Sequence, residues 1–240
     1  MRVITCENYE QMSKAAALLV AAQLQLKPNC VLGLATGSTP EGMYAKLAEM
    51  FQNGEVDFAS ATTFNLDEYF PIARENDQSY YYFMDKHLYS KVNLNLENVH
   101  IPNGSAPNAD VECANYDAKI DAAGGIDLQI LGIGSNGHIA FNEPSSELSA
   151  GTHKVQLTEE TIKDNSRFFA NESDVPREAL TSGMATIMKS RKIILMASGA
   201  NKREPIAKLM SGKITTDCPA TMLNMHSDVV IIADKAALGQ

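Results

Sequence analysis

Residues 126–144 decide the fold class of this chain, and they read IDLQILGIGSNGHIAFNEP. The stretch opens with a short apolar block of Leu and β-branched residues at 126–131, which is typical of a buried strand. The loop that follows contains three glycines and also carries Asn136, His138 and Glu143. Ligands bind beyond the carboxyl ends of the strands in open α/β sheets. We therefore expect this loop to hold functional side chains as well as to turn the chain.

Short apolar runs of the same kind recur along the chain and alternate with helical patterns. The predicted strands cover residues 30–35, 62–66, 127–133, 192–197 and 228–233. Residues 9–26 place apolar side chains on one helical face, and helix-like patterns also cover 41–53, 110–123, 177–190 and 200–211. This alternation predicts an α/β fold of three layers, in which helices cover both faces of a mostly parallel sheet.

No repeat, low-complexity tract or Pro/Gly linker divides the 240 residues, and this length fits one large domain. We expect a single domain over residues 1–240. Ser, Thr and Asn cluster within 143–176, so we expect an irregular, lid-like segment there.

Composition restricts the class of partner. The formal net charge is −9 and Lys and Arg do not cluster, which argues against a nucleic-acid surface. The longest apolar block, 15–22, is too short to span a membrane, and the chain does not open with a signal-peptide pattern. The four cysteines lie far apart, and we interpret them as buried, reduced thiols of a cytoplasmic protein.

The turn at 34–44, LATGSTPEGMY, is a first candidate site. Thr39 suits the N-cap of a helix and Pro40 its first position. Free N–H groups and small hydroxyls at a helix N-terminus form an anion cradle. An ordinary capped turn explains this stretch equally well, and the Gly-Lys-Ser/Thr ending of a Walker A loop is absent.

A second candidate is Asp67 in the stretch TTFNLDEY at 62–69, where a predicted strand ends. Side chains alternate along a strand, so only one of Asp67 and Glu68 can face the crevice. A carboxylate there can serve as a general base. Capping a turn is the commoner role of a lone Asp.

The pair His138 and Glu143 is a third candidate. Pro144 favours an extended conformation at Glu143, and the five-residue spacing fits a loop in which the carboxylate folds back onto the imidazole. Such a pair sets the imidazole tautomer and prepares it for proton transfer. We therefore predict a functional rather than a structural role for His138.

Arg167 and Lys202 are candidate cations for an anionic ligand. Lys202 follows the strand at 192–197 and a glycine, near the start of another helix, which suits an anion. Most surface Lys and Arg are simply solvated, so neither residue identifies the ligand by itself. The aromatic run at 80–83 is interpreted as helix packing.

Together these motifs resemble those of glucosamine-6-phosphate deaminases. The resemblance covers about residues 1–234 and rests on the turn at 36–40, the stretch 64–69, the loop 134–144, residues 165–169 and Lys202. The strings NLDEY and HIAFNEP are highly specific in combination. The resemblance implies a Rossmann-like fold and conversion of glucosamine 6-phosphate and water into fructose 6-phosphate and ammonia. It also implies that no metal or redox cofactor takes part.

The resemblance also implies roles for the matching residues. His138, oriented by Glu143, would assist opening of the pyranose ring. Asp67 would take the C2 proton and return a proton at C1. The residues that would hold the phosphate of this small-molecule sugar phosphate are Gly37, Ser38, Thr39, Arg167 and Lys202.

Asn136 stands where some members of this family have Asp. Asn cannot act as a base, so we expect Asn136 to position His138 or the substrate by hydrogen bonds. Hexameric, allosteric members carry an Arg and a Lys where this chain has His153 and Val155, and they continue beyond the position of Gln240. The resemblance therefore implies a monomer that N-acetylglucosamine 6-phosphate does not activate.

Two other functions are compatible with the same fold. A 6-phosphogluconolactonase-like hydrolase also binds a sugar phosphate, but the stretches 64–69 and 141–144 favour the deaminase. A non-catalytic, sugar-phosphate-sensing domain of a transcription regulator would need a DNA-binding module. Residues 1–30 hold only one predicted strand and one amphipathic helix, with few basic residues.

Overall fold

The structure is a computed structural model that describes residues 1–166, 169, 171 and 175–240. Within these residues, seven strands form a sheet in which every neighbouring pair is parallel. Their spatial order is β1 (Arg2–Cys6), β10 (Val229–Asp234), β9 (Lys192–Ala197), β6 (Leu128–Leu131), β2 (Val31–Leu34), β3 (Thr62–Asn65) and β5 (Val99–His100). The predicted α/β fold with a mostly parallel sheet is confirmed.

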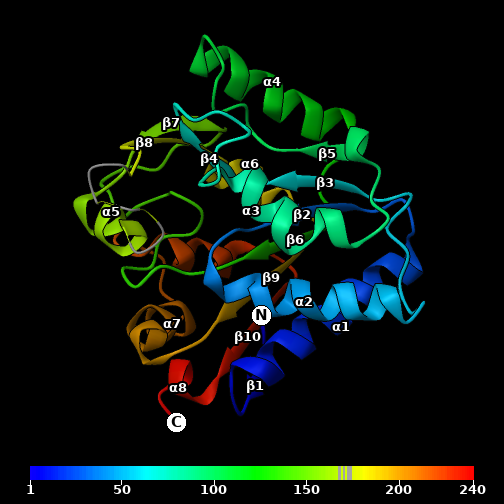
Figure 1. Ribbon diagram of the computed structural model, residues 1–240. Helices are drawn as coiled ribbons and strands as arrows, with labels where there is room; N and C mark the ends of the chain where they lie inside the picture. The colour runs from blue at the N-terminus through cyan, green and yellow to red at the C-terminus, as the bar shows by residue number, and fades with distance from the viewer. Residues whose placement is uncertain (167–168, 170, 172–174) are drawn as a thin grey trace.

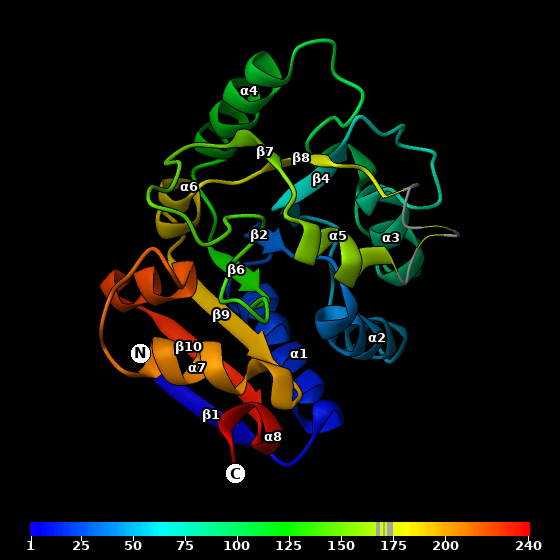
Figure 2. The same ribbon diagram turned by 90° about the vertical axis from the view of Figure 1, so that its left-hand side faces the viewer.

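Helices cover both faces of this sheet, as Figures 1 and 2 show. Helices α1 (Tyr9–Leu26) and α2 (Ser38–Gln52) pack together on one side of β9 and β10, and α7 (Arg203–Met210) lies on the other. The strands between these layers are apolar because they are buried on both faces. All six residues of β10 are buried, as are the last five of β9.

The residue before α1 explains where this helix begins. Asn8 precedes the helix in an extended conformation, and its side chain accepts a hydrogen bond from the Gln11 N–H, as an N-cap should. The predicted range 9–26 is confirmed. The remaining helical elements within the described residues are α3 (Tyr80–His87), η1 (Tyr89–Lys91), η2 (Leu96–Asn98), α4 (Ala109–Ala122), α5 (Glu159–Asn165), α6 (Met184–Met188), η5 (Ala200–Lys202), η6 (Pro219–Met225) and α8 (Lys235–Leu238).

A second, antiparallel sheet was not predicted. It contains β4 (Asp67–Phe70), β8 (Glu178–Thr181) and β7 (His153–Gln156), in that order. The single helix predicted over 177–190 is therefore wrong, because β8 occupies its first part and α6 its second. The segment 143–176, predicted as irregular, contains β7 and α5.

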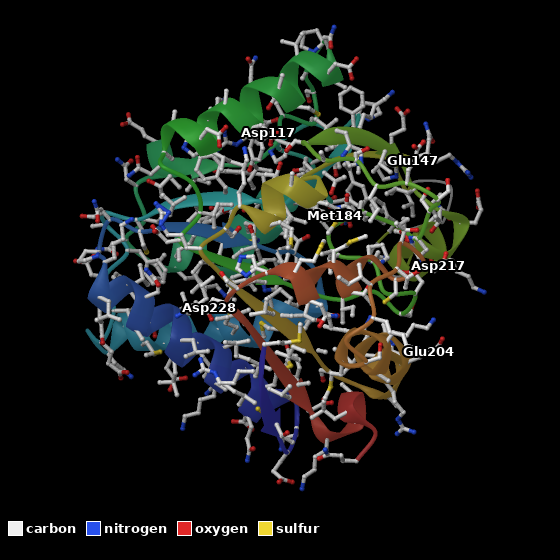
Figure 3. The ribbon with its side chains drawn as sticks, turned by 180° about the vertical axis from the view of Figure 1, so that it is seen from behind. Asp117, Glu147, Met184, Glu204, Asp217 and Asp228 are labelled. Atoms are coloured by element: carbon white, nitrogen blue, oxygen red, sulfur yellow. The ribbon has the colours of Figure 1, made fainter. Side chains whose placement is uncertain are left out.

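Asp117 on α4 ties the second sheet to the rest of the chain. Its Oδ2 accepts a hydrogen bond from the backbone N–H of Thr152 at 2.8 Å, and its Oδ1 accepts one from the Thr186 hydroxyl at 3.0 Å. Figure 3 views this junction from behind, with Asp117 on α4 and Met184 at the start of α6. Because β7, β8 and β4 form one sheet, this junction also supports the strand that carries Asp67.

The four cysteines, Cys6, Cys30, Cys113 and Cys218, are free and buried, as expected for thiols that behave as small apolar side chains. None of the helices within the described residues is long and apolar enough to cross a membrane.

Candidate active site

A cavity of about 690 Å³ lies beyond the carboxyl ends of β2, β6 and β9. In an open α/β sheet this edge is where ligands bind. Its lining includes 35–39 after β2, Asp67 and Tyr69 of β4, several residues of α3, the loop residues 132–135, His138 and Phe141, and Ser198, Asn201 and Lys202 after β9. The predicted sites at 37–39, Asp67, His138 and Lys202 therefore share one cavity.

His138 and Glu143 form the predicted imidazole–carboxylate pair. Nδ1 of His138 lies 3.2 Å from Oε2 of Glu143. The Glu143 side chain is 8% exposed and does not line the cavity, whereas the His138 side chain is 23% exposed and does. A carboxylate acceptor at Nδ1 favours the tautomer that carries its proton there, which leaves Nε2 as the basic nitrogen. Glu143 thus holds the imidazole on the side away from the cavity.

Asn136 takes part in the same network. Its Nδ2 donates a hydrogen bond to Glu143 Oε2 at 2.7 Å, and its Oδ1 accepts one from the His138 backbone N–H at 3.1 Å. Asn136 does not line the cavity. These contacts agree with the expectation that Asn136 positions His138, and they place no base at this point.

Thr161 on α5 also contacts Glu143, and no motif along the chain pointed to this residue. Its hydroxyl donates a hydrogen bond to Glu143 Oε1. Burial alone would raise the pKa of Glu143. The hydrogen bond and charge of His138, together with hydrogen bonds from Thr161 and Asn136, lower this pKa to about 2. Glu143 therefore stays ionised while it orients the imidazole.

The glycines of the loop allow the imidazole to sit where it does. A Cβ on Gly134 would lie 2.4 Å from Cε1 of His138. Gly137 has φ +91°, and a Cβ there would lie 2.4 Å from Sγ of Cys218. Only glycine meets both requirements without moving a neighbour, because it has no Cβ and tolerates positive φ.

Asp67 begins β4 and faces the cavity, with 6% of its surface exposed. Burial, and next the negative charge of Glu68, raise the pKa of Asp67 to about 8. A carboxyl group in this environment is a stronger base than an ordinary Asp once it is ionised. The alternative that Asp67 only caps a turn does not fit its place on a paired strand.

The turn after β2 differs in detail from the prediction. Helix α2 begins at Ser38, and Gly37, with φ +88°, is its N-cap. The expectation that Thr39 caps the helix and Pro40 opens it is wrong, because the chain makes its sharp turn at Gly37. A glycine N-cap has no side chain to occupy the first N–H groups of α2. Gly37, Ser38 and Thr39 all line the cavity, which suits an anion.

Lys202 lines the cavity after the carboxyl end of β9, which β6 separates from β2 in the central sheet, and it is the N-cap of α7. Asp234 fixes the turn that precedes Lys202. Its carboxylate accepts hydrogen bonds from the Ser198 hydroxyl and, at 3.1 Å, from the Gly199 N–H. Arg167, the other predicted cation, lies outside the described residues.

Aromatic side chains form one wall near Asp67. The Tyr80 ring stacks on Phe141 with centroids 6.2 Å apart, and it lies 4.8 Å from the Tyr69 ring. All three residues line the cavity. The interpretation of the aromatic run as helix packing therefore misses its place on the cavity, which Tyr80, Tyr82 and Phe83 all line.

The described residues contain no group of three or more His, Cys, Asp or Glu side chains placed to hold a metal ion. The chemistry that this part of the chain offers is proton transfer, beside a cradle for an anion.

Comparison with known proteins identifies the family. The family model described as glucosamine-6-phosphate isomerases/6-phosphogluconolactonase matches residues 7–232. A glucosamine-6-phosphate deaminase of Halothermothrix orenii is 56% identical over 237 residues, which cover 99% of this chain and 98% of that protein. One from Clostridium botulinum is 53% identical over 99% of this chain and 97% of its own length.

Solved structures agree with this result. A structure described as a monomeric glucosamine-6-phosphate deaminase has a TM-score of 0.97 at 41% identity, and the match covers 100% of this chain and 99% of that one. The 6-phosphogluconolactonase of Thermotoga maritima has a TM-score of 0.77 at 20% identity over 98% and 99% of the two chains, which shows a shared fold. The chain belongs to the family of glucosamine-6-phosphate isomerases and 6-phosphogluconolactonases.

Proposed function

We propose that this protein is an enzyme that converts glucosamine 6-phosphate and water into fructose 6-phosphate and ammonia. The observation that carries this function is the meeting of three groups in one cavity: the buttressed imidazole of His138, the buried carboxyl group of Asp67 and the anion cradle at 37–39. Relatives 53–56% identical over the whole chain are named for this reaction.

The reaction begins with opening of the pyranose ring, which needs a proton moved from the C1 hydroxyl to the ring oxygen. We assign this transfer to Nε2 of His138, which lines the cavity while Glu143 holds the other ring nitrogen. Glu143 and Asn136 hold the imidazole in place, so little reorganisation accompanies the transfer. General acid–base assistance of this kind contributes about 10²–10⁴-fold to a rate.

Isomerisation follows on the open-chain amino aldehyde. Asp67, once ionised, removes the proton from C2 and gives an enolamine, and a proton then returns to C1. The product is a ketimine at C2. Water adds to this ketimine, and the C–N bond breaks with release of ammonia and formation of the C2 ketone of fructose 6-phosphate. Atoms and charge balance without an oxidant or reductant.

The phosphate anchors the substrate while the ring opens and the chain changes shape. Gly37, Ser38 and Thr39 offer N–H groups and hydroxyls at the start of α2, and Lys202 adds a positive charge. Arg167 is assigned to the same role on its motif. These contacts lie away from C1 and C2, so they bind substrate and product alike.

We also propose that the enzyme acts as a monomer and that N-acetylglucosamine 6-phosphate does not activate it. The solved relative at 41% identity is described as monomeric, which supports the first point. His153 and Val155 on β7 offer no pair of cations for a second phosphate, which supports the second.

The test is to incubate the purified protein with glucosamine 6-phosphate and to measure ammonia and fructose 6-phosphate in parallel. We expect equal amounts of both products. The matched measurement offers 6-phosphogluconolactone to the same preparation. Hydrolysis of the lactone without release of ammonia from glucosamine 6-phosphate would overturn the proposal in favour of the lactonase reaction.

A further inference from the structure

Glu68, the neighbour of Asp67, is a buried carboxyl group that the reaction described above does not use. It is 2% exposed and lies on β4. Because side chains alternate along a strand, Glu68 points away from the cavity face that Asp67 occupies, and it does not line the cavity. Burying a carboxylate is costly unless hydrogen bonds compensate for the lost water.

The partners of Glu68 are backbone N–H groups. Oε1 accepts hydrogen bonds from the Tyr69 N–H at 2.9 Å and the Tyr80 N–H at 2.8 Å. Oε2 accepts one from the Tyr81 N–H at 3.1 Å. Two of these donors are the first N–H groups of α3, which have no partner within the helix. Glu68 therefore joins β4 to the start of α3.

Helix α3 is one wall of the cavity. Tyr80, Tyr82, Phe83, Lys86 and His87 of this helix line it. The Tyr80 ring stands next to Tyr69 and Phe141, near Asp67. Glu68 fixes the first residue of α3 to β4, the strand that carries Asp67. It thus sets the distance between Asp67 and the wall that α3 forms.

We propose that Glu68 is a positioning residue for the Asp67 step: it holds the start of α3, and with it the Tyr80 side of the cavity, against the strand that carries Asp67. This inference rests on the proposed deaminase reaction. One buried carboxylate thereby controls both the place of the cavity wall and the proton affinity of Asp67.

The titratable groups around Asp67 and Glu68 determine how strongly the charge of Glu68 raises the proton affinity of Asp67. Tyr80 faces it from α3 and Tyr116 from α4, and Tyr69 lies on β4 itself. The phenols of Tyr80 and Tyr116 stay neutral, since burial raises the pKa of each well above the usual range. No cation among the described residues forms an ion pair with Asp67 or Glu68. Burial also raises the pKa of Glu68, to about 7, so Glu68 is largely ionised over the range in which Asp67, with a pKa of about 8, loses its proton.

Glu68→Gln is the first test, because it removes the charge and keeps the shape. Its side-chain oxygen can still accept from Tyr69 and Tyr80, while its NH₂ group replaces the acceptor for the Tyr81 N–H. We expect the acid limb of the kcat/KM profile to move to lower pH by about one unit, since a neighbouring negative charge is lost. We expect kcat on the plateau to fall about tenfold with little change in KM.

Ser79→Ala is the matched control for a merely structural role. The Ser79 hydroxyl accepts from the Tyr82 N–H at 3.0 Å, so this variant removes a neutral cap from the same turn of α3. We expect a lower Tm and an acid limb at the wild-type pH. Glu68→Asp keeps the charge on a shorter side chain, so its acid limb should stay in place while kcat falls.

A titration of the Asp67 carboxyl group by ¹³C NMR gives a readout that needs no turnover. We expect Asp67 to titrate at lower pH in Glu68→Gln than in the wild type. If the deaminase reaction is wrong, the wild type shows no turnover but this shift remains. If wild-type turnover is present and neither the acid limb nor the titration moves in Glu68→Gln, Glu68 is only a structural cap and the inference is overturned.

Discussion

Glu143→Gln tests whether the carboxylate behind His138 does what its contacts imply. The substitution keeps the size of the side chain and removes its charge. Oε2 then no longer pairs as an anion with Nδ1 of His138, and the contact at 3.2 Å loses the feature that sets the tautomer. We expect kcat to fall by about 10²–10⁴-fold, the range of general acid–base assistance. KM should stay near the wild-type value, because the phosphate contacts lie elsewhere.

The effect on stability follows from the pKa of Glu143. Its pKa is lowered from 4.5 to about 2, so the folded protein favours the ionised form by roughly 3 kcal/mol. Because the folded pKa lies below the unfolded one, this stability is present above about pH 4.5 and is lost as the pH falls toward 2. Glu143→Gln should therefore be less stable than the wild type at pH 7, and the difference should shrink as the pH falls.

The assay compares kcat, KM and the free energy of unfolding from pH 7 down to pH 3 in both proteins. Glu178→Gln is the matched control. Glu178 pairs with Lys154 at 2.8 Å on β8, outside the cavity lining. Glu178→Gln should leave kcat unchanged and lose stability at low pH as the wild type does. Wild-type kcat in Glu143→Gln, or a stability difference that does not depend on pH, would refute the reasoning.

Two further substitutions test the rest of the site. Asn136→Asp would place a carboxylate oxygen of residue 136 about 2.7 Å from Oε2 of Glu143, so the two carboxyl groups should share a proton. One pKa of the pair is then higher in the folded protein than in the unfolded chain. The variant should therefore lose stability relative to the wild type as the pH rises through this folded pKa. The Tm of both proteins, measured at several pH values, checks this. Lys202→Met should raise KM for glucosamine 6-phosphate about 10–100-fold with kcat nearly unchanged, because a hydrogen bond to a charged group contributes about 1.5–3 kcal/mol. The exposed Lys213→Met is its control and should leave KM unchanged.

The interior of the central sheet could be predicted because β2, β3, β6, β9 and β10 coincide with short, largely apolar runs, which local sequence reveals. The edge strand β5 contains only Val99 and His100 and gives no such run. The second sheet could not be predicted, because its strands pair across long separations in the chain. Residues 177–190 contain several good helix formers, yet Glu178–Thr181 pairs with Asp67–Phe70 and becomes β8. Tertiary pairing overrides such weak local propensity.

The same distinction applies to the site. Asp67, His138 and Glu143 belong to short motifs at strand ends, so their type and position indicated chemistry. Thr161 reaches Glu143 from α5, and Glu68 reaches α3 from β4. Both contacts depend on how distant elements pack, which spacing along the chain does not encode.

The role of Asp67 as the C2 base is the central claim, and Asp67→Asn in D₂O tests it most directly. With the wild type, glucosamine 6-phosphate in D₂O should give ammonia and fructose 6-phosphate that carries solvent deuterium at C1, observed by NMR. Asp67→Asn should form neither product and exchange no proton at C2, while it still binds inorganic phosphate with nearly the wild-type affinity. Product formation by Asp67→Asn, or exchange of the C2 proton with solvent in that variant, would contradict this role.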